Sequence, residues 1–401
     1  MRNSRVRVLF ISISSLPLQI PSDKQFINDL VLNLPEDISP SIWTLNETVP
    51  CNTIVHMGKK DIYFRSVCRL GHKPWCSGNE GLVIHRHKPI LNLSEIIMSI
   101  LFASLGSLRK IINEQKPQIL HFTDDLGPAI PIVKGLFPRL KITCSKPSVL
   151  NIVNKKNFLY SLRIRTGLIF ADTIIAFTKA CKDNLLKIGI KNNIEVIPWG
   201  VILPNVLSDF KIKRIRSEFG CSMDDILVVG SPRNLDKMLI NAVKAGENAT
   251  KNTNLHFLFC IKPTLYRKEF SKLSTQKVQV IKSPSNFYEI LESADVLFAP
   301  QGSNNHTSLP YLLWLEAMVR GTPVVTEFNP GVEETIENKV SGILYNGFDS
   351  SQYKLKELCN KFLLRKMKQA AKKIACEKYN IKKIAARYAA LWLSLKDYKH
   401  E

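Results

Sequence analysis

The segment TSLPYLLWLEAMVRGTPVV, residues 307–325, reads as a buried helix that runs directly into a buried strand. Apolar residues cover most faces of the predicted helix, and a β-branched run follows it. A single carboxylate, Glu316, stands inside this apolar stretch. Because an unpaired charge costs several kcal/mol in an apolar environment, we expect Glu316 at a pocket edge, where a ligand meets it. The alternative is a solvated side chain at the start of a helix.

The same alternation of short β-branched runs and longer amphipathic runs continues along the chain. The predicted strands lie in the runs RVRVLFISI, QILHF, KITCS, DTIIAFT and IEVIPWGV, and then in DILVVGS, NLHFLFCI, KVQVIKS, ADVLFAP and TPVVTEF. Near-continuous apolar strands, each followed by a helix, are typical of parallel sheets covered on both faces. Pro198 and Gly200 interrupt this pattern. We therefore predict an α/β protein of two tandem, doubly wound Rossmann-like domains, residues 1–203 and 204–379.

Composition places the chain among ordinary globular proteins. Its 401 residues are enough for about two or three domains, and 45% of them are hydrophobic and 22% charged. The apolar run at residues 94–108 is shorter than the roughly 18 residues of a membrane span and contains four serines, so we predict a core helix there. The N-terminus superficially suggests a signal peptide, but its apolar part is short and β-branched and no cleavage site follows. We therefore expect a cytoplasmic protein.

Cysteine and histidine residues give no sign of a metal site. The nine cysteines are odd in number and form no Cys-x-x-Cys pair, which is typical of reduced thiols. His85 and His87 lie on one face of a predicted strand but have no acidic or cysteine partner nearby. We interpret them as a solvated strand end and predict no metal.

The net charge of +22 predicts a surface that attracts anions. Nucleic acid, an anionic membrane surface and phosphorylated substrates are the classes of partner to consider. The sequence contains no module of aromatic and basic residues that stacks bases, so we predict no nucleic-acid partner. The two last helices, KFLLRKMKQAAKKIACEKY and IKKIAARYAALWLSLKDY, are amphipathic and basic. We expect one face of each helix to pack on a domain, with attachment to a membrane surface as the alternative. Residues 155–165 raise the same hypothesis of membrane attachment.

Neither G-x-G-x-x-G nor G-x-x-x-x-G-K-[ST] follows a predicted strand, which excludes the simplest dinucleotide and P-loop sites. The segment LEAMVRGTPVVTEFNPGVEETIENKVSGILYN instead resembles the family-4 group of GT-B glycosyltransferases, also called glycosyl transferases group 1. The resemblance extends to ADTIIAFTKACKDNLLKIGI, to IEVIPWGV and to YNIKKIAARYAALW. It implies an inter-domain cleft and a closing helix, about residues 380–401, that joins the N-terminal domain.

The resemblance also implies roles for residues of the second domain. A Glu at the position of Glu316 hydrogen-bonds the ribose hydroxyls of a nucleotide sugar, which explains why a carboxylate is kept there. NPGVEET offers Gly331 and backbone N–H groups at a helix start, suited to a donor phosphate or sugar. The alternative is a plain helix-capping loop. We also assign Val332 and Thr322 to the donor site.

Basic residues after the first strand of the second domain are candidates for the diphosphate. Arg233 and Lys237 lie one helical turn apart if a helix begins near residue 234, so both can reach one anion. We assign both a catalytic role in stabilising the leaving diphosphate, although the family usually has a Gly-Arg pair and a five-residue step to the Lys. A solvated pair is the alternative, and Lys262 is a weaker candidate.

The chain departs from the family pattern at three places. The family has a second Glu eight residues before the ribose Glu, but Ser308 occupies that position. An H-x-H pattern reduces to His121 and Thr123, followed by Asp124 and Asp125, and the opening loop of the first domain lacks paired glycines. Either Asp124, His306 or main-chain groups fill these roles, or the fold serves binding without turnover. We assign Asp124 as catalytic and Ser308 to the donor site.

The resulting hypothesis is a retaining, metal-independent hexosyltransferase. It uses a nucleotide sugar as co-substrate, needs no other cofactor, and acts on a glycan, polysaccharide or lipid-linked acceptor at the inner face of the membrane. The alternative is a catalytically silent GT-B protein that binds a nucleotide or a partner protein. A third hypothesis, a GT-B epimerase, requires acid and base residues that we do not locate.

Overall fold

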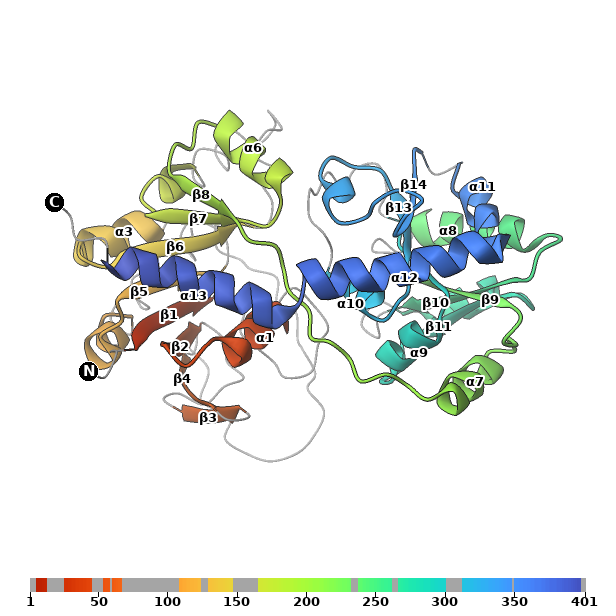
Figure 1. The fold of residues 1–401 in the computed structure, drawn as a ribbon, viewed down its shortest axis with the longest axis horizontal. Helices are drawn as coiled ribbons and strands as arrows, with labels where there is room; N and C mark the ends of the chain where they lie inside the picture. The colour runs from red at the N-terminus through yellow and green to blue at the C-terminus, as the bar shows by residue number, and fades with distance from the viewer. Residues whose placement is uncertain are drawn as a thin grey trace.

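The computed structural model describes residues 5–12, 25–44, 53–57, 60–66, 108–123, 129–146, 165–231, 237–261, 266–300, 312–347 and 350–397. They form two sheets that lie side by side, and two long helices, α12 (Lys361–Lys378) and α13 (Ile381–Asp397), run along both (Figure 1). The predicted α/β fold of two tandem Rossmann-like domains is confirmed. The domain limits 1–203 and 204–379 stay a prediction. The last strand of the first sheet ends before residue 203, and the first strand of the second sheet begins after residue 204.

The N-terminal sheet has eight strands in the order β3-β4-β2-β1-β5-β6-β7-β8. Only β3 and β4 pair antiparallel; the other neighbours are parallel. The strands are β1 (Val6–Ser12), β2 (Ile38–Thr44), β3 (Thr53–Met57), β4 (Lys60–Ser66), β5 (Ile119–Phe122), β6 (Lys141–Lys146), β7 (Thr173–Ala176) and β8 (Asn193–Val196). The sequence did not predict β2, β3 or β4. Pro40 hides β2, and it is tolerated because β4 pairs with β2 only from Ser41 onward.

The C-terminal sheet has six parallel strands in the order β11-β10-β9-β12-β13-β14. This is the strand order 3-2-1-4-5-6 of a Rossmann fold. The strands are β9 (Ile226–Gly230), β10 (Leu255–Ile261), β11 (Val278–Lys282), β12 (Val296–Phe298), β13 (Val324–Glu327) and β14 (Gly342–Tyr345). The first five coincide with predicted strands. Apolar, mostly β-branched or aromatic residues dominate each of them, as a sheet covered on both faces requires, although polar residues interrupt β10, β11 and β13.

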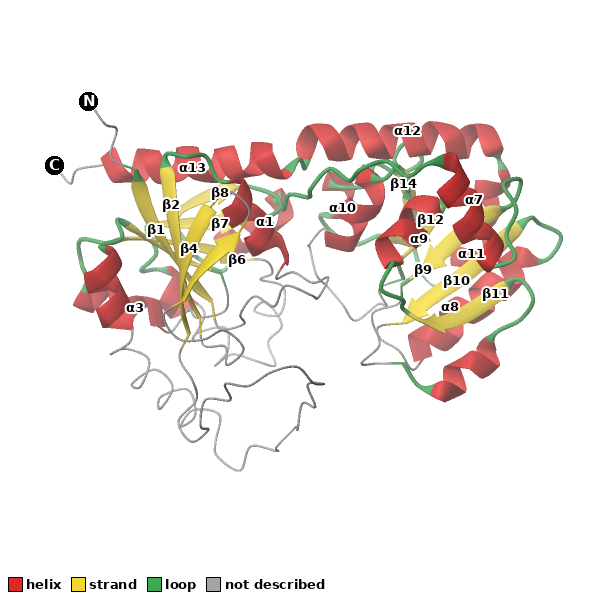
Figure 2. Ribbon diagram, turned by 90° about the horizontal axis from the view of Figure 1, so that it is seen from below, coloured by secondary structure: helices red, strands yellow, loops and turns green. Residues whose placement is uncertain are grey.

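Helices cover both sheets, and α12 and α13 connect the two domains along one side of the molecule (Figure 2). They are α1 (Gln25–Asn33), α3 (Ala129–Leu136), α6 (Lys179–Lys187), α7 (Asp209–Glu218), α8 (Lys237–Thr250), α9 (Phe287–Ser293), α10 (Leu312–Val319) and α11 (Ser351–Lys356), with the 3-10 turns η2 (Lys268–Leu273), η3 (Val332–Glu334) and η5 (Glu357–Cys359). Figure 2 shows α12 beside the C-terminal sheet and α13 beside the N-terminal sheet, end to end. Within the described ranges, no helix is long and apolar enough to cross a membrane.

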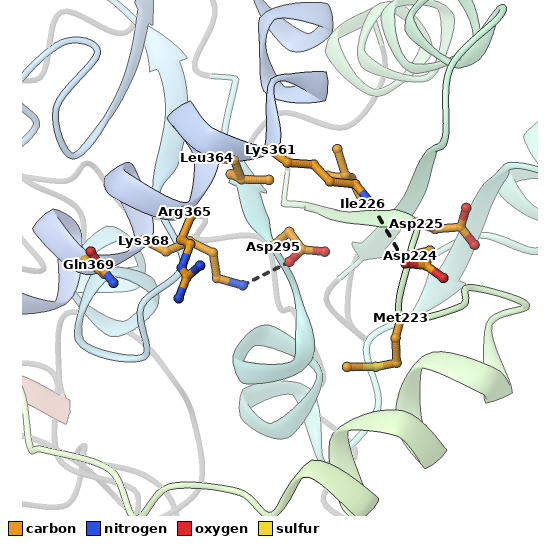
Figure 3. A pocket seen from close by; sticks show the side chains of 10 residues that line it. All are labelled: Met223, Asp224, Asp225, Ile226, Asp295, Lys361, Leu364, Arg365, Lys368 and Gln369. Carbon is orange, nitrogen blue, oxygen red and sulfur yellow. Dashed lines mark hydrogen bonds and ion pairs between the residues drawn. The ribbon is translucent and has the colours of Figure 1, made fainter.

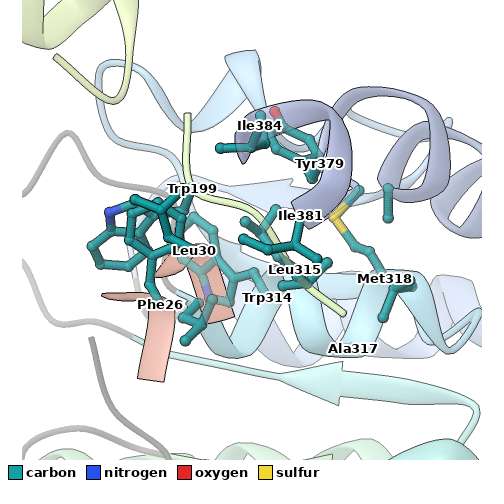
Figure 4. Packing of buried hydrophobic residues seen from close by; sticks show 14 of the residues in the cluster. Phe26, Leu30, Trp199, Trp314, Leu315, Ala317, Met318, Tyr379, Ile381 and Ile384 are labelled. Atoms are coloured by element: carbon teal, nitrogen blue, oxygen red, sulfur yellow. The ribbon is translucent and has the colours of Figure 1, made fainter. Parts of the chain in front are cut away.

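The chain passes between the two domains twice, and the two connecting segments lie side by side. The Val201 N–H donates to the Tyr379 carbonyl at 2.8 Å, and the Ile381 N–H donates to the Val201 carbonyl at 2.9 Å. Gly200 allows this approach, because a Cβ there would lie 2.9 Å from the Ile381 Cα. Apolar residues of α1, α10 and α13 pack around the crossing in one buried cluster (Figure 4).

Candidate functional site

The strand order of the C-terminal sheet indicates where a ligand binds. In an open parallel sheet, the crevice lies outside the carboxyl ends of the strands, at the point where the strand order reverses. Here the order reverses between β9 and β12, which end at Gly230 and Phe298. The segments that follow these two strands carry Arg233 and Ser308.

Several predicted site residues lie outside the described part of the chain. Arg233, Ser308 and Lys262 are three of them, and Asp124, which follows β5 at the reversal point of the N-terminal sheet, is a fourth. Lys237 begins α8, but its side chain is not described. The roles of these five residues stay predictions.

Glu316 lies in α10, where seven of the eight residues are buried, and its own exposed fraction is 4%. The alternative of a solvated helix start is therefore wrong. The partner of the carboxylate is Arg320, whose Nη1 hydrogen-bonds the Glu316 Oε2 and donates to the Glu316 carbonyl at 2.7 Å. The i,i+4 spacing of this pair is visible in the sequence, although we did not predict the pair from it.

The guanidinium of Arg320 also lies over an aromatic ring. Its Cζ is 4.8 Å from the centroid of the Tyr288 ring in α9. Burial raises the pKa of Glu316 above its usual range, although the neighbouring Arg320 acts in the opposite direction. One arginine therefore compensates only part of the cost of burying this carboxylate.

A second buried carboxyl, Asp29, belongs to α1 of the N-terminal domain. Its exposed fraction is 6%, and burial followed by the charge of Glu316 raises its pKa to about 7. Among the described residues, its Oδ2 has no hydrogen-bond partner, and neither has the buried Nε of Arg320. An acceptor from one domain and a donor from the other therefore stand unpaired around Glu316. A bound hydroxyl group, which both donates and accepts, would satisfy such a pair.

Apolar packing brings α1 and α10 together around this polar cluster. Phe26 and Leu30, which flank Asp29 in α1, belong to the same buried cluster as Trp314 and Leu315 of α10 (Figure 4). Because both helices are anchored by large side chains, the polar residues between them are held in place. No three His, Cys, Asp or Glu side chains gather as metal ligands in the ranges that the structure describes.

The predicted phosphate loop has a left-handed residue at its centre. Gly331 has φ 91°, a conformation that favours glycine, and it precedes the three-residue turn η3. Val332 is buried, and its N–H donates to the Asn329 carbonyl at 3.0 Å within this turn. The helix start expected here is thus a short 3-10 turn, in which one N–H is already used.

Thr322 and His121 have structural contacts. The Thr322 hydroxyl donates to the Leu291 carbonyl at 2.9 Å and so joins α9 to the segment before β13. The His121 ring bonds the hydroxyls of Thr143, at 2.9 Å, and Ser145, at 3.0 Å. Ser145 in turn bonds the Tyr388 hydroxyl of α13, and burial lowers the pKa of His121 to about 3. This neutral network packs α13 on the N-terminal sheet.

The chain resembles solved glycosyltransferases over almost its whole length. Sucrose-phosphate synthase from Thermosynechococcus elongatus superposes with a TM-score of 0.72 at 14% identity, over 98% of this chain and 99% of that chain. A glycosyltransferase from Rickettsia africae gives 0.68 at 13% identity, over 98% and 100%. HepE from Anabaena gives 0.67 at 14% identity, over 98% and 100%. The chain has the GT-B fold.

Neither the comparison with family models nor that with curated proteins gives a match to this sequence. At identities this low, the GT-B likeness shows the architecture alone. The activity must therefore be argued from the residues of the site.

Proposed function

We propose that this protein is a retaining glycosyltransferase that binds a nucleotide-sugar donor in its C-terminal domain. The observation that carries this proposal is Glu316, a carboxylate buried at the position of the ribose-binding Glu and only partly compensated by Arg320. A ribose diol would donate two O–H bonds to it, which lowers the cost of its burial. The solved complexes of HepE with UDP and UDP-glucose have the same fold and support this class of donor.

The proposed chemistry needs positive charge near the leaving diphosphate. Arg233, Lys237 and Lys262 belong to the segments at or after the ends of β9 and β10, where a parallel sheet presents its ligand-binding edge. Fixed cations there would neutralise the diphosphate as the bond to the sugar breaks. The hexose, the retention of configuration and the independence of metal are parts of this proposal, as is the role of Asp124.

The acceptor that we propose is a glycan, polysaccharide or lipid-linked molecule. A net charge of +22 suits a phosphorylated carrier and an anionic membrane surface, at which the protein would act from the cytoplasmic side. The exposed faces of α12 and α13 are basic, which supports this placement.

A catalytically silent nucleotide-binding protein is the second candidate. Ser308 stands where the family has its sugar-side Glu, and Thr123 stands where it has a His. The Thr123 hydroxyl and N–H both point to the Ile11 carbonyl, at 3.3 and 3.1 Å. Binding of a nucleotide without any turnover of its sugar conjugate would favour this candidate.

Thermal unfolding in the presence of nucleotides tests the donor site. We expect one of UDP, GDP, ADP or CMP, or its sugar conjugate, to stabilise the wild type by about 2.7 kcal/mol at 100 times its Kd. Glu316→Gln should abolish the shift, whereas Glu333→Gln, at an exposed position of the same domain, should keep it. A wild type that responds to none of these ligands would contradict the proposed function.

A further inference from the structure

A side chain of the C-terminal domain caps a helix of the N-terminal domain. The Glu334 carboxylate accepts the N–H of Lys179 at 2.7 Å and the N–H of Ala180 at 2.8 Å, the first two residues of α6. The preceding residue, Thr178, accepts the Cys181 N–H at 3.0 Å in the ordinary capping position. The first turn of α6 is therefore satisfied jointly by its own cap and by the other domain.

The main chain of Glu334 is tied to the crossing between the domains. Its carbonyl accepts the Tyr379 hydroxyl at 3.0 Å, and the Tyr379 carbonyl accepts the Val201 N–H at 2.8 Å. Consecutive hydrogen bonds thus connect α6, the loop of residues 329–335, and both crossing segments. The neighbouring Glu333 is exposed.

The contact places a negative charge at the positive end of a helix that belongs to the other domain. The first N–H groups of a helix have no partner within the helix, and they carry the positive end of its dipole. A carboxylate is the side chain that pairs best with them, through short, charge-assisted hydrogen bonds. Because these bonds come from the other domain, they form only when the two domains are docked as in this structure.

We propose that Glu334 is a positioning residue that docks the 329–335 loop on α6 and thereby sets the affinity of the chain for its nucleotide donor. This inference rests on the proposed function for the donor, because the loop contains Gly331 and Val332, which we assign to the donor site. The loop contains only a three-residue turn of regular structure, so its conformation depends on contacts with other elements. The bonds to α6 and to Tyr379 supply these contacts from two sides.

The first test measures docking without any nucleotide. Glu334→Gln keeps the size of the side chain but removes its charge and one acceptor, and Glu333→Gln is the matched control. Amide hydrogen exchange should accelerate at Lys179 and Ala180 in Glu334→Gln only, and small-angle scattering should show a larger radius of gyration. Unchanged exchange at both amides would overturn the proposal, whatever the nucleotide does.

The second test measures the link to donor binding by titration calorimetry with UDP. We expect Glu334→Gln to weaken UDP binding about five- to tenfold and Glu333→Gln to leave it unchanged. If the wild type and Glu334→Gln bind UDP equally, the positioning role fails while the proposed donor site stands. If the wild type binds no nucleotide, the proposed function fails, and the exchange measurement still decides whether Glu334 docks the loop.

Discussion

Two carboxylates of the C-terminal domain, the half-buried Asp295 and the buried Glu316, are held in opposite ways. Asp295 lies at the amino edge of the sheet, directly before β12, and accepts hydrogen bonds from Arg216 at 2.8 Å and the Leu227 N–H at 3.0 Å. It also accepts one from Lys368 at 2.9 Å (Figure 3). Burial alone would raise its pKa, but Lys368 and Arg216 bring it below the usual value. For Glu316, the effect of burial exceeds that of Arg320, and its pKa is raised.

The difference separates a structural carboxylate from a functional candidate. The bonds of Asp295 join α7, β9, β12 and α12, and a pocket of about 340 Å³ lies beside it. The protein itself therefore supplies the hydrogen-bond and charge partners of the Asp295 carboxylate. Glu316 lies at the contact of two domains with unpaired polar atoms nearby, and this incomplete pairing is the reason that we propose it, and not Asp295, as the ligand-binding carboxylate.

Replacing Asp295 by Ala should have the largest effect on stability. The change leaves Arg216 buried without its carboxylate, and breaking a buried ion pair costs about 3–5 kcal/mol. Urea unfolding followed by circular dichroism would measure this loss. Lys361→Ala is the control, because its pair with Asp224 spans 3.9 Å between side chains that are 68% and 99% exposed, and should matter by less than about 0.5 kcal/mol. A similar, small loss of stability in both variants would show that Asp295 is no more important for folding than an exposed ion pair.

The sequence predicted the strands of both sheets better than the partners of the buried charges. Apolar runs such as those of β9 and β10 are local signals, and so they identify a covered parallel sheet. The partner of Asp295, in contrast, lies 79 residues away at Arg216, and Asp29 meets Glu316 only because two domains pack together. Such contacts are properties of the tertiary structure. Arg320 is the exception, since its i,i+4 spacing from Glu316 is local.

Asp29→Asn should have an intermediate effect that depends on pH. Because folding raises the pKa of Asp29 from 3.8 to about 7, the folded chain holds a proton that the unfolded chain releases in this range. The free energy of unfolding of the wild type is therefore not reduced by Asp29 below pH 4, and it falls as the pH rises from 4 to 7. Asn does not titrate, so the variant should gain up to about 4 kcal/mol over the wild type between pH 4 and pH 8.

Urea unfolding of Asp29→Asn and the wild type across this pH range measures the effect. Asp37→Asn, at an exposed position just after α1, is the matched control and should stay within about 0.5 kcal/mol of the wild type throughout. If the difference between Asp29→Asn and the wild type is the same at pH 4 and pH 8, the carboxyl of Asp29 is not held as the structure indicates.

Glu316→Gln should have the smallest effect on stability, about 1 kcal/mol or less at pH 8, in contrast to Asp295→Ala. Glutamine keeps an acceptor for Arg320 but loses the charge. The charge of Glu316 is one cause of the raised pKa of Asp29, so its removal relieves the repulsion on Asp29, which is ionised at pH 8 and compensates Arg320 in its place. Thermal and urea unfolding of this variant at pH 8 would show a nearly unchanged protein.

A double-mutant cycle tests whether Asp29 takes over in this way. If it does, combining Asp29→Asn with Glu316→Gln removes both carboxylates of the cluster, and the double variant should be about 1–2 kcal/mol less stable than the sum of the two single effects predicts. Additive changes would mean that the two carboxyls act independently, and that the unpaired Nε of Arg320 does not respond to Asp29. A coupled result would show that a carboxylate from each domain acts on Arg320 at the proposed ribose site, so that a donor binding to Glu316 also acts on the contact between the domains.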